Sequence, residues 1–363
     1  MTPPRAPPKV PIDAIADYRD RIDVRSPAEY ADDHLPGAES HPVLSDDERA
    51  RVGTLHAQDS EFVAKRVGAA LVARNIATML ETAFADRPRD WAPLVYCWRG
   101  GKRSGALAHM LNEIGWKAAQ LDGGYRSYRR HVLERLAVQP RQFRFRVICG
   151  LTGSGKSRLL RSLADRGAQV LDLEALARHR GSLLGDLPDA PQPSQKRFDS
   201  EVLDALLHLD RARPVYVESE SKKIGTLQVP DALLEAMRSA DCIRLDTPRP
   251  LRIALLKDEY PHFLADTAAL NERLAHLTGL HGGKTIARWA AAAAAGDWDA
   301  LVDELLVQHY DPTYARAIER NFARIESALT VVPAGVDDAD FRRLAAELDG
   351  ELARRVPDPE PAR

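Results

Sequence analysis

Short apolar runs alternate along the chain with longer stretches in which apolar residues recur at helical spacing. The short runs predict strands and the stretches between them predict helices. Strands that alternate with helices form parallel sheets, which bind ligands beyond the carboxyl ends of their strands. The predicted strands are residues 18–25, 93–96, 118–121, 143–149, 168–172, 214–218 and 241–246. The predicted helices are residues 26–30, 60–85, 105–112 and 157–165, followed by an almost entirely helical region from 249 to 352 that is interrupted at 260–263, 280–285 and 309–312.

The chain is too long for one typical hydrophobic core. Its 363 residues predict two α/β domains, which we place at residues 12–137 and 138–355, the second ending in a helical extension. Five prolines among the first 11 residues predict an extended, poorly ordered lead-in, and residues 356–363 have the same character. We find no signal-like segment and no long apolar run, so we expect a cytoplasmic protein that has no membrane partner.

Composition narrows the chemistry. The chain is 44% hydrophobic and 29% charged, as in ordinary globular proteins. Its net charge of −2 means that any nucleic-acid surface must be local. Three cysteines, Cys97, Cys149 and Cys242, are odd in number and far apart, which argues against a disulfide framework or a Cys-x-x-Cys metal site.

The segment after the second predicted strand carries the first candidate site. Cys97 ends that strand, and a basic, glycine-rich loop leads from it into a helix. Two glycines let successive backbone N–H groups turn inward, which makes an anion-binding nest at a helix N-terminus. A cysteine there has a lowered pKa and is a candidate nucleophile, whereas the alternative is a small buried cysteine at a strand end. The predicted anion loop is Arg99, Gly100, Gly101, Lys102, Arg103 and Ser104.

The strand at 143–149 leads into a second phosphate-binding pattern. Residues 150–157 match GxxxxGK[ST] between a strand and a helix, the context that a P-loop requires. Backbone N–H groups would surround a diphosphate, Lys156 would contact its terminal oxygens, and Ser157 is the one candidate Mg²⁺ ligand. The alternative is a glycine-rich turn without a ligand. The predicted diphosphate-binding residues are Gly150, Gly153, Ser154, Gly155, Lys156, Ser157 and Glu218.

Glu218 belongs to this set because it ends the strand at 214–218, where P-loop proteins carry an acid. The polar segment 218–225 is expected to face the phosphate, and the alternative is that Glu218 and Glu220 belong to a solvated loop. The P-loop pattern leaves open ATP hydrolysis, phosphoryl transfer and a diphosphate leaving group. The sequence does not locate a pocket for a nucleotide base.

A local basic stretch separates the two motifs. Residues 97–146 contain eleven Lys or Arg and three acids, with aromatic residues interleaved. Basic residues among aromatics suit an RNA backbone and exposed bases, and the alternative is a solvated, arginine-rich linker helix. The candidate RNA-binding residues are Arg126, Arg129, Arg130 and Arg141.

Several of these motifs, in this order, resemble a rhodanese domain: residues 23–30, residues 34–38, the Cys97 loop, and residues 121–125. Five residues between Cys97 and Arg103 also resemble the C-x5-R loop of rhodanese-like phosphatases, which holds a phosphate. A rhodanese-like domain joined to the P-loop and to the ESES-x2-IG segment at 218–225 is similar to the tRNA 2-selenouridine synthase family.

That resemblance implies two reactions on the wobble uridine of tRNA. The 2-thiouridine is S-geranylated with geranyl diphosphate, and selenium from selenophosphate then replaces the geranylthio group. The P-loop would stabilise the departing diphosphate, and Cys97 would attack selenophosphate and carry selenium. The resemblance implies no tightly bound cofactor, a tRNA anticodon stem-loop as partner, and an enzyme that supplies selenophosphate. The geranyl chain is expected under the helices after residue 250.

Three other functions fit part of the sequence. An ATP-dependent, rhodanese-type tRNA thiolation enzyme would use a Cys97 persulfide and would need ATP. A phosphatase would use the C-x5-R loop and leave the P-loop without a role. A non-enzymatic RNA-binding module would leave the reactive cysteine unexplained.

Overall fold

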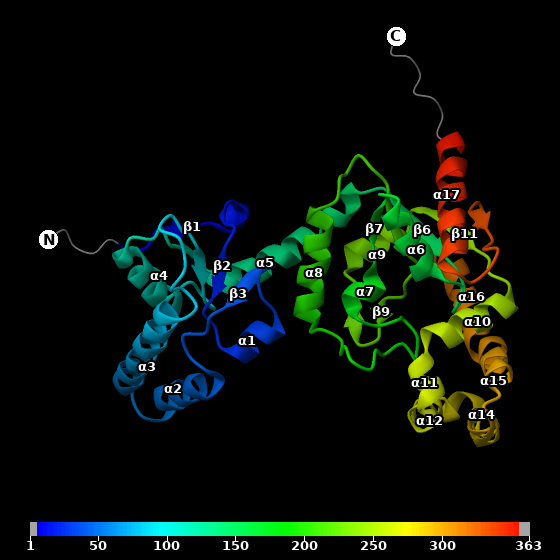
Figure 1. Cartoon of the computed structure of the whole chain (residues 1–363), viewed down its shortest axis with the longest axis horizontal. Helices are drawn as coiled ribbons and strands as arrows, with labels where there is room; N and C mark the ends of the chain where they lie inside the picture. Colours follow the sequence, from blue (N-terminus) through cyan, green and yellow to red (C-terminus); the bar gives the residue numbers. More distant parts are fainter. Residues whose placement is uncertain (1–5, 356–363) are drawn as a thin grey trace, which may run out of the picture. The chain divides into compact units, whose positions relative to one another are not determined.

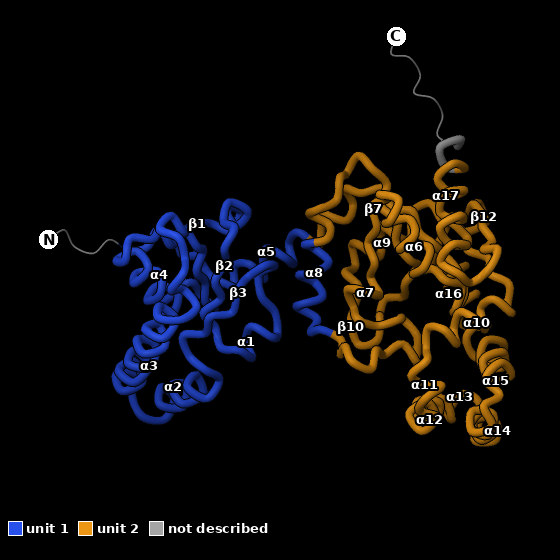
Figure 2. The backbone as a smooth tube through the Cα atoms, viewed as in Figure 1, with its two compact units in different colours: residues 1–135, 193–204 blue, residues 136–192, 205–363 orange. Residues whose placement is uncertain are grey.

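The computed structural model describes residues 6–355, and it forms two units that are described separately (Figure 1). The first unit contains residues 1–135 and 193–204, and the second contains residues 136–192 and 205–363 (Figure 2). The first boundary between the units lies between residues 135 and 136, whereas the sequence predicts it between residues 137 and 138. The return of residues 193–204 to the first unit has no counterpart in the predicted boundaries. The predicted poorly ordered segments at 1–5 and 356–363 lie outside the described residues.

The first unit is built on a five-stranded sheet in the order β1-β5-β4-β2-β3, and every pairing is parallel. Its central strand β4 is buried at all three positions because helices and neighbouring strands surround it. The strands are β1 (Lys9–Val10), β2 (Arg21–Asp23), β3 (Ala38–Ser40), β4 (Leu94–Tyr96) and β5 (Ala119–Leu121). The helices are η1 (Ile12–Asp17), α1 (Pro27–Asp32), α2 (Asp46–Gln58), α3 (Glu61–Glu81), α4 (Lys102–Ile114) and α5 (Gly124–Leu136).

The lead-in is more ordered than the prolines predict. Strand β1 pairs with β5, and the backbone N–H groups of Gln120 and Asp122 donate to Pro8 and Val10. Proline suits this place because the strand lies at the edge of the sheet, where an N–H group need not be paired. The prediction of a poorly ordered segment is therefore wrong for residues 8–10.

Helix α8 (Gln195–Leu207) is shared between the two units. Its first turns carry Ser200 and Asp199, which hydrogen-bond to Asp33 and Arg129 of the first unit. Both acceptor groups are buried, so these contacts fix the helix on the unit through polar pairs rather than apolar packing alone.

The second unit has its own five-stranded parallel sheet in the order β12-β11-β6-β8-β7. Helices α6 and α17 pack on it through an apolar cluster that includes Leu160, Phe341 and Ile243. Its strands are β6 (Phe145–Cys149), β7 (Gln169–Leu171), β8 (Val215–Glu218), β11 (Asp241–Leu245) and β12 (Leu329–Val331), and β9 (Lys223–Ile224) forms a small antiparallel hairpin with β10 (Leu227–Gln228). The helices of its sheet region are η2 (Gln139–Gln142), α6 (Lys156–Asp165), α7 (Leu173–Ala177), α9 (Asp231–Arg238) and α17 (Asp338–Arg355).

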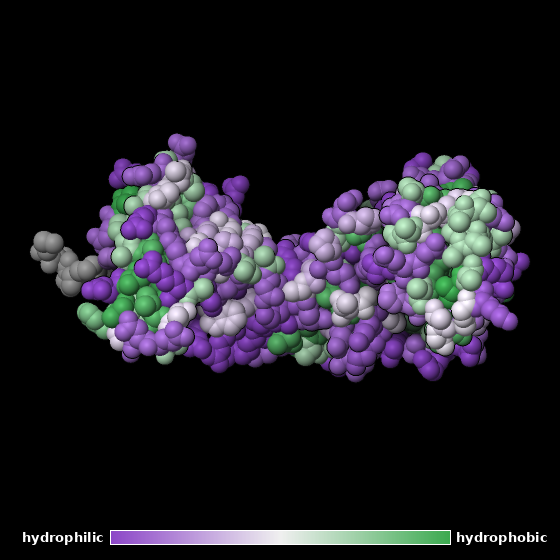
Figure 3. Space-filling view, turned by 90° about the horizontal axis from the view of Figure 1, so that it is seen from below, coloured by the Kyte–Doolittle hydropathy of each residue, from purple (hydrophilic) through white to green (hydrophobic). Residues whose placement is uncertain are grey.

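A helical region follows β11 and has a core of its own, which includes Phe263, Leu274 and Trp289. Hydrophobic residues gather at the right of Figure 3, where helices α12 and α14 of this region lie. The helices are α10 (Arg249–Glu259), α11 (Pro261–Ala265), α12 (Thr267–Ala275), α13 (Thr278–His281), α14 (Gly283–Ala295), α15 (Trp298–Leu305), η3 (Leu306–Tyr310) and α16 (Asp311–Asn321).

The predicted interruption at 309–312 is not a break. Helix α15 continues through the π-helical turn η3 directly into α16. Pro312 lies directly after the π turn, and the wider turn accommodates both its ring and its missing N–H inside the continuous helix. The predicted architecture, a parallel α/β unit followed by a second parallel α/β unit with a helical extension, is confirmed.

Candidate functional site

Cys97 directly follows β4, at the carboxyl end of the first sheet. Its carbonyl oxygen accepts a 2.8 Å hydrogen bond from the Tyr125 N–H. The loop folds closely over this bond: a Cβ on Gly124 would lie 2.2 Å from the Cys97 oxygen, and one on Gly100 would lie 2.4 Å from the Leu121 oxygen. Gly100 and Gly124 both have positive φ angles, so glycine is required at both positions for space and for conformation.

Two buried polar side chains orient the Cys97 thiol. Ser104 Oγ lies 3.1 Å from Cys97 Sγ, and Gln120 Nε2 donates to Ser104 Oγ and to the Gly101 carbonyl, each at 2.8 Å. Gln120 donates to the Ser104 oxygen, so the serine proton is available to the Cys97 sulfur, the nearer acceptor, while the Gly101 carbonyl lies at 3.4 Å. Burial raises the pKa of Cys97, but hydrogen bonds from Ser104 and Gly101 and the charge of Arg103 outweigh it and lower the pKa below its ordinary value.

The three loop cations are placed differently. Arg103 is half-buried and its Nη1 lies 2.9 Å from Glu29 Oε2. Arg99 and Lys102 are exposed, and neither forms an ion pair within residues 6–355. Helix α4 begins at Lys102, so its first N–H groups lie next to these charges. The loop therefore presents positive charge to solvent beside a nucleophile, an arrangement suited to a tetrahedral anion.

The P-loop connects β6 to α6 in the second unit. Gly153 and Gly155 have φ angles of +73° and +85°, which an L side chain rarely adopts. Lys156 Nζ donates to the Gly150 carbonyl at 3.2 Å. Thr152 Oγ1 and Ser154 Oγ are buried and have no hydrogen-bond partner among the described residues, so the loop offers donors for a ligand.

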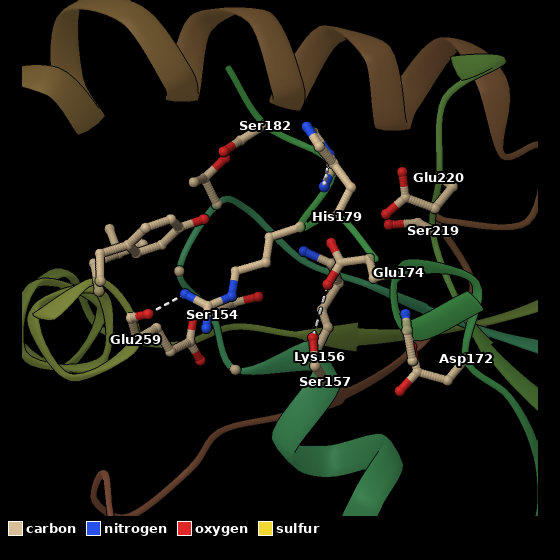
Figure 4. Close-up of a pocket in the computed structure, with 18 of the residues that line it drawn as sticks. Ser154, Lys156, Ser157, Asp172, Glu174, His179, Ser182, Ser219, Glu220 and Glu259 are labelled. Atoms are coloured by element: carbon tan, nitrogen blue, oxygen red, sulfur yellow. Dashed lines mark hydrogen bonds between the residues drawn. The ribbon is translucent and has the colours of Figure 1, made fainter. Parts of the chain in front are cut away.

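The P-loop lines a polar cavity of about 250 Å³ (Figure 4). Lys156 and Ser157 point into it from α6, and Asp172, Glu174 and Glu220 approach from the carboxyl ends of β7 and β8. Ser157 Oγ donates to Glu174 Oε2 at 2.9 Å. The further lining residues that the sequence does not identify as site residues are Arg161, His179, Arg180, Glu259, Tyr260 and Tyr314.

Glu218, predicted to face the phosphate, lies behind the cavity wall. Its Oε1 accepts the Glu174 N–H at 2.8 Å, its Oε2 has no partner among the described residues, and it does not line the cavity. The next acid along the segment, Glu220, lines the cavity instead. Burial, followed by repulsion from neighbouring carboxylates, raises the pKa of Glu218; the same causes, burial first, raise those of Glu174 and Glu220.

The oxygen donors around Ser157 fit a hard cation. Ser157 and Glu174 are in contact, and Asp172 lines the same cavity. Serine and carboxylate oxygens are the ligands that Mg²⁺ prefers, and a bound Mg²⁺ would neutralise a diphosphate among these acids. No group of three or more His, Cys, Asp or Glu side chains within residues 6–355 is arranged to hold a metal alone. The Mg²⁺ site at Ser157 stays a prediction.

An apolar cavity of about 70 Å³ adjoins the polar one. The two share the lining residues Thr152, Ser182, Leu256 and Tyr260. The rest of the apolar wall comes from the helical region, and the side chains that face this cavity include Phe263, Leu270, Trp298, Leu301, Val302 and Leu305.

The candidate RNA-binding arginines lie in different environments. Arg126 and Arg130 are exposed and form no ion pair among the described residues. Arg129 lies 2.5 Å from Asp199, and Arg141 lies 2.8 Å from Glu235 in the second unit. The RNA contact of all four stays a prediction.

Sequence reasoning missed Gln120 and Arg180 entirely. Gln120 is a single polar position in a short apolar strand, and only the fold places it against Ser104. Arg180 lies in a loop without a motif; its guanidinium lies 4.7 Å from the centre of the Tyr260 ring and donates to the Glu259 carbonyl. Glu174 had a usable signal, because it lies two residues after Asp172, just past a strand end.

The fold and the two anion loops define the class: a rhodanese-like domain joined to a P-loop domain. Residues 12–131 match the rhodanese-like domain, and residues 143–281 match the tRNA 2-selenouridine synthase AAA domain. Proteins named tRNA 2-selenouridine synthase are similar to this chain. The one from Shewanella piezotolerans is 32% identical over 84% of this chain and 90% of its own length. The one from Nitrosomonas europaea is 35% identical over 66% of this chain and 63% of its own length, so the chain spans less than two thirds of that relative.

The chain therefore belongs to the tRNA 2-selenouridine synthase family. No helix within residues 6–355 is both long enough and apolar enough to span a membrane.

Proposed function

We propose that this chain is a tRNA 2-selenouridine synthase that works in two steps. It S-geranylates wobble 2-thiouridine of tRNA with geranyl diphosphate at the P-loop, and it then replaces the geranylthio group with selenium from selenophosphate at Cys97. It is a transferase that acts in the cytoplasm, holds no cofactor tightly, and depends on an enzyme that supplies selenophosphate. The family relationship and the two anion loops support this proposal.

The observation that carries the first step is the apolar cavity beside the P-loop cavity. A ligand that fills both must have an anionic end and a slender apolar end. The lining of this second cavity is mostly aliphatic and aromatic, which suits a hydrocarbon chain better than a nucleotide base with its polar edges and favours an isoprenoid diphosphate over a nucleotide. The position also fits the expectation of an apolar slot under the helices after residue 250.

The first step breaks the bond between C1 of the geranyl group and the diphosphate oxygen. The sulfur of 2-thiouridine forms the new bond to that carbon, and the diphosphate leaves with the electron pair. Charge therefore develops on the bridging oxygen, which the backbone N–H groups of the loop and Lys156 can stabilise. This step consumes no ATP.

The oxidation state of selenium limits how the second step can proceed. Selenium in selenophosphate is fully reduced, so its transfer to Cys97 as a selenopersulfide would release phosphorus as phosphite and would later need a reductant. We therefore propose that Cys97 accepts the phosphoryl group of selenophosphate rather than carrying selenium, which is the role that the family resemblance implies. The Cys97 thiolate attacks phosphorus, the S–P bond forms, and the Se–P bond breaks with its electrons on selenium. Hydrogen selenide then attacks C2 and expels geranylthiolate, and water releases phosphate from Cys97.

Nucleoside mass spectrometry tests the proposal. Pure protein is incubated with 2-thiouridine tRNA and geranyl diphosphate, and selenophosphate is added afterwards. We expect a geranylated nucleoside first and 2-selenouridine second, without ATP. Cys97→Ala should geranylate and fail to selenate, and Lys156→Ala should lose geranylation first. Phosphorus NMR of the second step should show phosphate and no phosphite.

Three outcomes contradict the proposal or one of its parts. A mass change that needs ATP and a sulfur donor would favour the thiolation enzyme. Selenation that survives in Cys97→Ala would remove Cys97 from the second step, and geranylation that survives in Lys156→Ala would remove the P-loop from the first.

A further inference from the structure

Trp98, the residue after the nucleophile, is unusual for an aromatic side chain because it is 37% exposed. Its ring centre lies 5.3 Å from that of Tyr125, and the two planes are tilted by 32°, so the rings are in contact. Tyr125 itself is 1% exposed. Trp98 is therefore the solvent-facing member of an aromatic pair whose other member is buried.

The pair is held firmly. The Tyr125 hydroxyl donates to Asp33 at 2.8 Å, and the Arg25 guanidinium lies 4.0 Å from the Tyr125 ring centre. The backbone of Trp98 is fixed as well, because the Arg126 N–H donates to its carbonyl at 3.0 Å. An exposed ring on such a support loses little conformational entropy when a ligand stacks on it.

Three basic residues lie close to Trp98. Arg99 follows Trp98, Lys102 lies in the same loop, and the side chain of Arg126 is exposed next to the backbone bond just described. None of the three forms an ion pair within residues 6–355. Exposed aromatic rings among unpaired cations are the elements with which proteins hold unstacked bases of single-stranded RNA.

We propose that Trp98 stacks on the target nucleobase and positions its C2 beside Cys97. This makes Trp98 a positioning residue, and it rests on the proposed function because the nucleobase is the substrate there. Stacking of one base on an aromatic side chain changes affinity by roughly 5- to 100-fold. The cations would contact the flanking phosphates irrespective of the base.

The test measures binding and catalysis separately. The full chain is titrated with two anticodon stem-loop RNAs, one with 2-thiouridine at the wobble position and one abasic there. Trp98→Ala should weaken binding of the first RNA roughly 5- to 100-fold and leave the abasic RNA unchanged. Trp98→Phe should recover most of the affinity. Leu133→Ala, which truncates another exposed apolar side chain of the same unit, should change neither.

Equal losses for both RNAs in Trp98→Ala, or no loss for either, would overturn the proposal. The binding test needs no turnover, so it is independent of the proposed function. A chain that distinguishes the two RNAs through Trp98 but makes no selenouridine would refute the proposed function and leave the role of Trp98 intact. With an active enzyme, Trp98→Ala should raise KM for geranylated tRNA in the selenation step more than it lowers kcat.

Discussion

Replacing Ser104 by alanine should slow the reaction of Cys97 with thiol reagents and shift its pH profile upward. Ser104 is fully buried, its hydroxyl can donate to Sγ at 3.1 Å, and Gln120 donates to the same hydroxyl oxygen. A hydrogen bond to a charged acceptor contributes about 1.5–3 kcal/mol. Its loss reduces the thiolate fraction below the pKa by roughly 10- to 150-fold.

The observed rate should fall by less than this. A thiolate of higher pKa is the better nucleophile, with a Brønsted slope of about 0.4–0.5, and this offsets nearly half of the loss on a logarithmic scale. We therefore expect a small methanethiosulfonate reagent to modify Cys97 about 4- to 15-fold more slowly at neutral pH, with a profile that rises at higher pH than in the wild type.

The measurement follows modification of Cys97 by peptide mass spectrometry between pH 5 and 9. Cys149 and Cys242 lie in the second unit, and their modification in the same samples serves as an internal reference. Ser104→Thr keeps the hydroxyl donor and should stay near the wild-type profile. A Ser104→Ala profile that coincides with the wild type would show that the hydroxyl does not stabilise the thiolate, and the account of the nucleophile would fail.

Three further results are expected. Burial raises the pKa of Asp33 to about 6, so its contribution to stability is present below about pH 4 and is lost as the pH rises through 6. Between pH 4 and 7 the free energy of unfolding of Asp33→Asn, measured in urea, should therefore rise relative to that of the wild type by up to about 3 kcal/mol. A difference between the two proteins that does not change with pH would refute this. Val302→Phe narrows the apolar cavity and should raise KM for geranyl diphosphate about tenfold. The affinity for inorganic diphosphate, measured by calorimetry, should stay unchanged. The pKa of Glu220 is raised by burial and then by nearby carboxylates, so without Mg²⁺ its protonation at lower pH should favour diphosphate binding. Glu220→Gln should weaken the pH dependence of diphosphate affinity. If the substitution leaves that pH dependence unchanged, Glu220 lies away from the ligand.

The sequence predicts the fold well where local patterns decide it. The strands before Cys97 and before the P-loop are short apolar runs, and the glycines after them appear where positive φ angles are needed. The 195–207 helix, by contrast, was not predicted, and its attachment to the first unit depends on Ser200 meeting Asp33 across 167 positions. No periodicity encodes a pairing of that kind, so neither the helix contact nor the unit boundary follows from local pattern.

The candidate sites show the same division. The two loops are contiguous, so their motifs place Cys97 and Lys156 directly. The partners that tune them come from other elements: Gln120 reaches Ser104 from β5, and Glu174 reaches Ser157 from the first turn of α7. Glu218 shows the limit of positional reasoning. It is the last residue of β8 and its carboxylate is taken up by the Glu174 N–H, whereas Glu220, beyond the strand end, lines the cavity.

The two anion loops differ in what they can do to an anion. The Cys97 loop holds a nucleophile of lowered pKa beside Arg99 and Lys102, which form no ion pair among the described residues, so a bound phosphate group can itself be attacked. The P-loop cavity offers Lys156 among acids and opens to an apolar cavity, so attack is better directed at a carbon that the diphosphate leaves. One loop is therefore suited to cleaving a bond to phosphorus and the other to stabilising a phosphate leaving group. A reaction that first expels diphosphate and later splits selenophosphate needs one of each.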